Sequence, residues 1–386
     1  VTIAAGAVVL AAGGLTRLYQ RNSASLNMGG DSYALALRAG ADLIDMEFVQ
    51  FFPIGHLAPR LVGMDPIMWD PFRYKLGGRL LNGDKEEFIE KYGASDSGTY
   101  TAPRDVTSYA IFKEVEAGRA SPNGGAYLSF THIDEATLRE AFGPVIDRLA
   151  DNGIDLTQRP IEVAPIAHYH MGGIRVTPEM ATTVPGLYAA GEAVGGANGA
   201  NRLSGNAITE ALVFGERAGR FAAQAASDKS WNGSWAREAV GDIEKMTPDS
   251  GSGPNFGKLF GELQTLMWDK VGLLRTGDKL EQALSRIRAM QAQDLPRMLR
   301  QDKGPFALGV QEWFDLRAAL ATAETITLAA LNRTESRGAH QREDLPDTAE
   351  TQTYNQCVRL TDGKLTIKSV PVRRTEFERV ALGAAQ

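Results

Sequence analysis

The chain of 386 residues lacks the features that mark several large classes of protein. Its one cysteine, Cys357, excludes an intrachain disulfide framework, a CxxC zinc site and an iron–sulfur cluster held by the chain's own thiolates. No run of about 18–20 apolar residues occurs, so the sequence predicts no membrane-spanning helix. Lys and Arg number 41 against 47 Asp and Glu, so the basic surplus of a nucleic-acid binder is missing.

What is present is the composition of an ordinary globular protein, with 43% hydrophobic and 23% charged residues. The length exceeds that of one usual core, so we expect two or three structural units. Scarce cysteine suits a reducing compartment, and we expect a cytoplasmic protein. The opening run VTIAAGAVVLAAGG has neither the basic start nor the cleavage site of a signal peptide. It predicts a buried strand from Ala7 to Ala12 that leads into a Gly13-Gly14 turn.

Hydrophobic spacing and capping residues predict the remaining elements. Asp31 is expected to cap a helix that stops at Gly40, because its side chain can accept from free backbone N–H groups. A strand is expected from Leu43 up to Pro53. Further strands are predicted at 160–170 and 186–193, and helices at 103–118, 206–225, 256–272, 279–293 and 311–336. The last three helices are typical of a small bundle, and a basic, strand-like tail follows.

A glycine-rich block from Gly186 to Gly215 carries the strongest chemical signal. A buried strand that ends in Gly191-Glu192 can present the carboxylate to a ribose or ribityl hydroxyl. The helix start at Asn206–Ile208 offers backbone N–H groups and a positive dipole end, which suit the anionic edge of a reduced flavin. The other interpretation is a glycine-rich turn before a core helix, and spacing alone does not separate the two.

Two side chains near this block suit an anionic substrate. Arg202 offers a planar fork of donors for a carboxylate, and its place between two buried elements disfavours a surface arginine. His168 stands at a strand end before a Gly-Gly turn, where the backbone can come close to a ligand. His170 is the weaker candidate and is expected to pack or to cap.

Several motifs resemble one known family. HYHMGGI (His168–Ile174), GLYAAGEA (Gly186–Ala193) and GANRLSGNAITEALVFG (Gly199–Gly215) are similar to the succinate dehydrogenase/fumarate reductase flavoprotein family, which includes L-aspartate oxidase. The runs AVVLAAGG, NMGGDSYALALRAGA, MEFVQFFPIG, PRDV and LNRTESRGAHQREDLP occur in the family's order. The resemblance implies an α/β fold with part of an FAD-binding Rossmann-like domain (1–52 and 161–226). An α+β capping domain (53–160) interrupts it, and a helical domain (227–386) follows.

The resemblance also implies site residues. It assigns contacts with FAD to Ala11, Ala12, Gly13, Gly14, Asp31, Gly191, Glu192, Arg202, Gly205, Asn206, Ala207 and Ile208. It makes Arg202 and His168 the ligands of a substrate carboxylate and Arg104 the proton donor or acceptor, with Asp70 and Arg73 as its proton relay. The residues alone leave other interpretations open. Arg104 can equally pair with Asp105, and Asp70 can form a solvated i,i+3 pair with Arg73. His340 is expected to be structural or to lie at the cofactor's edge, and no metal site is expected.

Two departures from the family bear on the substrate. The family's Gln-aromatic-His-Pro-Thr-Gly is here Gln50–Gly55, so Phe52 replaces a carboxylate-binding histidine. Trp69 replaces the threonine before the relay acid. With Phe52, Trp69, His168 and Arg202 lining the pocket, we expect an unsaturated monocarboxylate with an apolar end. The alternative is that His56 or Lys75 restores binding of a dicarboxylate.

A third departure concerns the cofactor. The family carries a GxGxxG turn near its N-terminus, and no such motif and no histidine for covalent flavin attachment precede Ala11. Either the sequence is a fragment or a partner chain supplies the pyrophosphate cradle. We therefore expect this chain alone to hold FAD poorly.

The expected function is FAD-dependent hydride transfer to or from the C–C bond beside a carboxylate. The expected partners are a small carboxylic acid and an iron–sulfur or other electron-transfer subunit, through which the protein would be peripheral to a membrane. Nucleic acid is not an expected partner. Two alternatives stay open: an amino-acid oxidase resembling L-aspartate oxidase, and a catalytically degenerate flavoprotein or assembly subunit.

Overall fold

The computed structural model describes residues 3–62, 67–93, 104–226, 253–299 and 308–372, without the side chains of Asp70, Arg104 and Asp105. The chain forms two compact units. The first contains Val1–Gln20, Leu26–Val49 and Tyr169–Gln386, and the second contains Arg21–Ser25 and Gln50–His168. The chain passes from one unit to the other within two strands, β3 (Val49–Ala58) and β6 (Ile161–His170).

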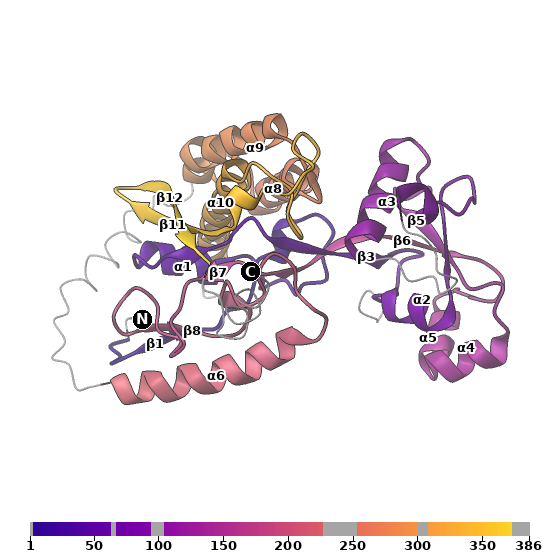
Figure 1. The fold of residues 1–386 in the computed structure, drawn as a ribbon, viewed down its shortest axis with the longest axis horizontal. Coiled ribbons are helices and arrows are strands. Elements are labelled where there is room, and N and C mark those ends of the chain that lie inside the picture. Colours follow the sequence, from indigo (N-terminus) through magenta and orange to yellow (C-terminus); the bar gives the residue numbers. More distant parts are fainter. Residues whose placement is uncertain (1–2, 63–66, 94–103, 227–252, 300–307, 373–386) are drawn as a thin grey trace, which may run out of the picture. The chain divides into compact units, whose positions relative to one another are not determined.

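The first unit begins with a small parallel sheet (Figure 1). In it, β1 (Val8–Leu10) pairs with β8 (Leu187–Ala189), so strands far apart in the sequence lie side by side. Helix α6 (Asn206–Ala225) packs on both strands. The small side chains Ala218 and Ala222 allow this close approach, and they share a core cluster with Tyr188. The carboxyl end of β8 therefore leads directly to residues that α6 contacts.

A second, antiparallel sheet and a helical layer complete this unit. The sheet has the order β12-β11-β2-β7. Its strands are β2 (Leu43–Ile44), β7 (Gly173–Ile174), β11 (Tyr354–Thr361) and β12 (Lys364–Pro371). Asp362 and Gly363 both have positive φ, the backbone that a tight two-residue hairpin between β11 and β12 requires.

The helical layer of the first unit follows from apolar residues spaced three and four apart. Its helices are α1 (Asp31–Arg38), α8 (Phe256–Val271), α9 (Gly277–Ala289) and α10 (Gly309–Asn332). In α8 the spacing buries Leu259, Leu263 and Met267 along one face. α8, α9 and α10 pack on one another, and α1 packs on α10 (Figure 1). Strand β9 (Leu274–Arg275) pairs in parallel with β10 (Gln341–Arg342). This pairing connects the segment between α8 and α9 to the segment that follows α10.

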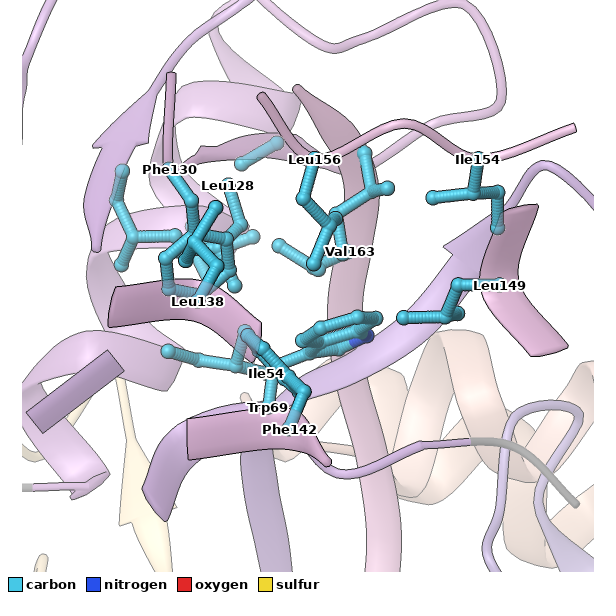
Figure 2. Packing of buried hydrophobic residues seen from close by; sticks show 14 of the residues in the cluster. Ile54, Trp69, Leu128, Phe130, Leu138, Phe142, Leu149, Ile154, Leu156 and Val163 are labelled. Atoms are coloured by element: carbon cyan, nitrogen blue, oxygen red, sulfur yellow. The ribbon is translucent and has the colours of Figure 1, made fainter. Parts of the chain in front are cut away.

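The second unit is a four-stranded sheet with helices packed around one core. The sheet order is β3-β6-β5-β4, with β4 at Arg79–Leu81 and β5 at Ala126–Ser129. Its helices are α2 (Asp70–Leu76), α3 (Arg104–Glu116), α4 (Glu135–Phe142) and α5 (Val145–Asp151). Figure 2 shows the core, in which Trp69 lies among Ile54, Phe142 and Leu149.

The predicted strand from Leu43 to Pro53 is wrong in two respects. The chain breaks at Asp45, whose φ is +56°, and so forms β2 and β3 separately. The Asp45 carboxylate there accepts from the backbone N–H of Gln356, a contact across the sequence that no local pattern reveals. β3 also continues past Pro53 to Ala58, because it lies at the sheet edge, where proline's missing N–H costs no pairing.

Other boundaries moved by a few residues. Asp31 is the first residue of α1, not its cap; Gly30, with φ of +91°, holds the cap position. β1 is shorter than the predicted strand from Ala7 to Ala12, and the prediction that it is buried is wrong, since Val8 and Val9 are exposed. The predicted strand 160–170 and helix 206–225 are confirmed as β6 and α6. Pro103, predicted in the first turn of α3, and residues 227–252 lie outside the described residues.

Candidate active site

The Gly13-Gly14 turn and Glu192 lie against each other in the first unit. Gly13 has φ of +75°, a conformation that favours glycine. At Gly14, an added Cβ would lie 2.3 Å from Oε1 of Glu192, so only glycine admits the carboxylate there. The backbone N–H of Gly30 donates to the Gly14 carbonyl over 3.2 Å, which places the start of α1, and so Asp31, beside this turn. The structure thus brings together predicted cofactor residues of both segments: Gly13, Gly14 and Asp31 of the first, and Glu192 of the second.

Glu192 is a partly buried carboxylate with defined partners. It follows β8 in the short turn Gly191–Ala193, and its Oε1 accepts from the backbone N–H of His170 over 3.1 Å. Burial raises the pKa of Glu192 to about 7, although that N–H and the Arg202 charge act to lower it. The group can therefore serve as an acceptor that gains its charge near neutral pH.

The first turn of α6 completes this arrangement. Gly205 has φ of +92° and ends the loop, and the 20-residue helix starts at Asn206 with its positive dipole end there. α6 contacts the turn that carries Glu192. Ile208 is 71% exposed although apolar. A hydroxyl acceptor, a turn that admits no side chain and a helix start fit the ribityl chain and the N1–C2=O edge of FAD.

Arg202 is not a surface arginine. Its side chain is only 7% exposed, and its guanidinium carbon lies 4.0 Å from the ring centroid of Tyr169. Nη1 also donates to the Leu203 carbonyl over 3.3 Å. The Tyr169 hydroxyl in turn donates to the buried carboxylate of Glu210. Neither Tyr169 nor Glu210 was predicted from the sequence, although Tyr169 stands between the two histidines of HYH and Glu210 lies one helical turn after Asn206.

His168 lies in the second unit, at the end of that unit's share of β6. Its Nδ1 is hydrogen-bonded to the Ser23 hydroxyl over 2.9 Å. The backbone N–H of Ser23 donates to the Ala167 carbonyl, which fixes the serine beside the imidazole. The His168 ring lies edge-on to Phe52, with 5.3 Å between the centroids. Ser23 belongs to no motif, so no sequence pattern pointed to it.

The other two histidines of interest are buried in the first unit. Nε2 of His170 donates to the Met46 carbonyl, and burial lowers the pKa of His170 to about 4. Nδ1 of His340 accepts from Arg275 over 2.7 Å, and burial with that cation holds its pKa well below the usual range. Both imidazoles are therefore neutral near pH 7.

The predicted proton relay lies in the second unit. Arg73 is 2% exposed, which does not suit a solvated surface pair. Asp70 and Arg104 are the first residues of α2 and α3, and the structure does not describe their side chains. Their predicted roles stay predictions.

The structure changes the expected picture of the substrate pocket. Trp69 is fully buried among core aromatics, because its large ring gains more from packing there than from lining an open space (Figure 2). Its Nε1 donates to Nδ1 of His56, while Nε2 of His56 donates to the Pro59 carbonyl. Burial lowers the pKa of His56. The apolar end predicted for the pocket therefore rests on Phe52, and His56 has both ring nitrogens engaged.

Comparison with known proteins decides the family. A family model described as FAD binding domain matches residues 1–208. A second, described as fumarate reductase flavoprotein C-term, matches residues 261–383. The chain belongs to the succinate dehydrogenase/fumarate reductase flavoprotein family. The expected α/β fold and the expected cofactor, FAD, are thereby confirmed.

Relatives within this flavoprotein family carry more than one activity in their names. A fumarate reductase flavoprotein of Mycobacterium tuberculosis is 34% identical over 403 residues, covering 97% of this chain and 67% of the relative. An L-aspartate oxidase of Streptomyces coelicolor is 34% identical, covering 90% of this chain and 58% of the relative. The solved Mycobacterium smegmatis Sdh1 in complex with UQ1 has a TM-score of 0.85 at 33% identity, over 99% of this chain and 64% of that one.

This flavoprotein chain thus spans about 62% of the length of the first curated relatives it matches. Among its described residues, none of the helices combines the length and the apolar character needed to cross a membrane.

Proposed function

We propose that the protein carrying this chain is an FAD-dependent oxidoreductase that transfers hydride to or from the C–C bond beside a substrate carboxylate. The observation that carries this proposal lies within the first unit. Arg202 is buried, its guanidinium carbon lies 4.0 Å from the Tyr169 ring centroid, and it is close enough to Glu192 for its charge to lower the pKa of that carboxyl. An anion-binding group and a flavin-binding group therefore belong to one neighbourhood.

FAD and the chain's residues have separate roles in this reaction. FAD, when bound, supplies the hydride acceptor or donor. Arg202 binds the substrate carboxylate through its fork and stabilises the charge that builds there during the reaction. His168, oriented by Ser23, provides a second donor for the acid. Arg104 exchanges the proton at the neighbouring carbon, and Asp70 and Arg73 carry that proton onward.

The proposal extends to the substrate, the partners and the location of the protein. The substrate is an unsaturated monocarboxylate with an apolar end, because Phe52 stands where the family resemblance places a carboxylate-binding histidine. An iron–sulfur or other electron-transfer subunit exchanges electrons with the protein. The protein is cytoplasmic and reaches a membrane only through such a partner.

A second candidate is an amino-acid oxidase, favoured by the relative named L-aspartate oxidase. Oxygen consumption that depends on an added amino acid would support it. Reduction of an unsaturated acid without oxygen would support the first proposal.

The cofactor assignment predicts a pH-dependent affinity for FAD. In the free protein the pKa of Glu192 is about 7, so a hydroxyl donor meets a protonated acid below pH 7 and a carboxylate above it. A carboxylate is the better acceptor, so FAD affinity should rise from pH 6 to pH 8. Glu192→Gln should bind FAD about 1–3 kcal/mol more weakly at pH 8, with no such rise.

Titration with FAD of the apo form of the whole protein that carries this chain, followed by flavin fluorescence, measures both effects. Glu179→Gln, at an exposed loop glutamate of the same unit, is the matched control and should behave as the unchanged protein. A protein that cannot be loaded with FAD under any condition would contradict the proposal.

A further inference from the structure

A group of polar side chains, buried at Tyr169 and Glu210, half-buried at Asn198 and exposed at Asn206, lies beside Arg202. It consists of Tyr169, Glu210, Asn198 and Asn206, which we call the Glu210 cluster. All four residues belong to the first unit, as does Arg202. Tyr169 comes from the end of β6, Asn198 from the glycine-rich loop, and Asn206 and Glu210 from the first turns of α6. The cluster therefore joins three separate segments at the arginine.

Arg202 packs on the Tyr169 ring. Its guanidinium carbon lies over the ring, 4.0 Å from the centroid, and guanidinium groups favour such packing on aromatic faces. The fork is the part of Arg202 that the proposed function assigns to the substrate carboxylate. A shift of the ring would shift the fork with it.

Hydrogen bonding to Glu210 holds the Tyr169 ring. The ring is 3% exposed and packs with Phe48 and Met171, and its hydroxyl donates to Oε2 of Glu210. Burial and the Glu210 carboxylate raise the pKa of Tyr169 far above its usual value, so the hydroxyl keeps its proton and remains a donor.

The second oxygen of Glu210 holds the loop. Oε1 accepts from Nδ2 of Asn198 over 2.5 Å, and Oδ1 of Asn198 accepts from Nδ2 of Asn206 over 3.3 Å. Glu210 is 6% exposed, and a buried carboxylate is costly unless both oxygens have donors. Here one oxygen of Glu210 accepts from Tyr169 of β6, and the other accepts from Asn198 of the loop that carries Arg202.

We propose that Glu210 is a positioning residue for Arg202: through Tyr169 and Asn198 it holds the guanidinium in the orientation that binds the substrate carboxylate. This inference rests on the proposed function of Arg202 as carboxylate ligand. No contact with substrate or cofactor is assigned to Glu210 itself. Glu210 acts on the affinity of Arg202 for the substrate carboxylate through Tyr169 and Asn198.

The chemistry of the cluster makes a specific substitution informative. Glu210 accepts at both oxygens, whereas glutamine has one acceptor and one donor. In Glu210→Gln an N–H of the amide therefore faces either the Tyr169 hydroxyl or Asn198 Nδ2. A second change, Asn198→Asp, restores the pairing, because the new carboxylate accepts from the glutamine amide and from Asn206. The double variant also has the net charge of the unchanged protein.

The experiment is calorimetric titration of the oxidised, FAD-loaded protein with cinnamate and with fumarate, neither of which can be reduced by it. The tighter of the two ligands is used for every variant, and melting temperature is recorded alongside. We expect Glu210→Gln to weaken binding about tenfold or more. We expect Glu210→Gln with Asn198→Asp to return to within about threefold of the unchanged protein. Glu216→Gln, on the same helix but in an exposed ion pair with Arg220, is the matched control.

Arg202→Ala separates the failure of this inference from the failure of the proposed function. If Arg202→Ala binds the acid as well as the unchanged protein does, Arg202 is not the carboxylate ligand and the proposed function loses its main support. If Arg202→Ala loses binding while folded Glu210→Gln retains it, the proposed function stands and the positioning role is wrong. A double variant that regains melting temperature but not affinity would show a merely structural role for Glu210 and would also overturn the inference.

Discussion

Replacing Arg104 with lysine is expected to lower kcat by roughly 10²–10⁴-fold, the range that positioned proton transfer contributes in enzymes. Lysine keeps the positive charge but has a single ammonium in place of the fork, and its donor ends at a different point. A role in binding alone would change KM and leave kcat nearly intact. A role in proton exchange instead lowers kcat at saturating acid.

The measurement is steady-state reduction of the acid by the FAD-loaded protein with an artificial electron donor. FAD content should be unchanged in Arg104→Lys, because no contact with FAD is assigned to this residue. Arg139→Lys is the matched control: its side chain is 53% exposed in an ion pair with Glu135. Arg202→Ala should differ from Arg104→Lys by impairing KM and kcat together. Near-normal kcat in Arg104→Lys would refute the proton role.

Replacing Phe52 with histidine is expected to shift the preference between acids toward fumarate. Phe52 is 3% exposed and offers no donor, and both nitrogens of the nearby His56 are engaged. A second carboxylate against such a face loses its hydration without compensation, at a cost of several kcal/mol, whereas an apolar group gains about 1.5–3 kcal/mol. The unchanged protein should therefore prefer a cinnamate- or acrylate-type acid.

A histidine at this position would supply a donor for the second carboxylate. The ratio of kcat/KM for fumarate to kcat/KM for cinnamate should then rise by about 10–100-fold, the equivalent of one charge-assisted hydrogen bond. Phe51→His is the matched control, because successive residues of a strand face opposite sides of the sheet. A clear advantage for fumarate in the unchanged protein would refute the apolar preference.

Local patterns in the sequence were sufficient for the elements whose ends are set locally. The strand β6 and the helix α6 follow from hydrophobic runs bounded by proline and glycine. The break at Asp45 could not be predicted from local patterns, because the Asp45 carboxylate bonds to Asn355 and Gln356, more than 300 positions later. The continuation of β3 past Pro53 depends on its place at the sheet edge, which one strand's sequence does not encode.

In the candidate site, too, residues within local motifs were predicted, and partners from distant segments were not. Glu192 and Arg202 stand in glycine-rich motifs whose local chemistry points to a cofactor and an acid. Ser23 contacts His168 across 145 residues, and Glu210 contacts Tyr169 across 41. Such partners depend on which segments the fold brings together. The same holds for Trp69, whose ring the structure places in the core of the second unit.

The most direct test of the proposed chemistry is anaerobic mixing of the FAD-loaded, chemically reduced protein with an unsaturated monocarboxylate such as cinnamate. The visible absorbance of oxidised flavin is followed over time, with Arg202→Ala as the comparison. We expect the acid to restore the oxidised spectrum in the unchanged protein and the variant to do so far more slowly. A reduced flavin that neither cinnamate nor fumarate reoxidises, but that oxygen reoxidises after reduction by an amino acid, would contradict the proposal and favour the oxidase.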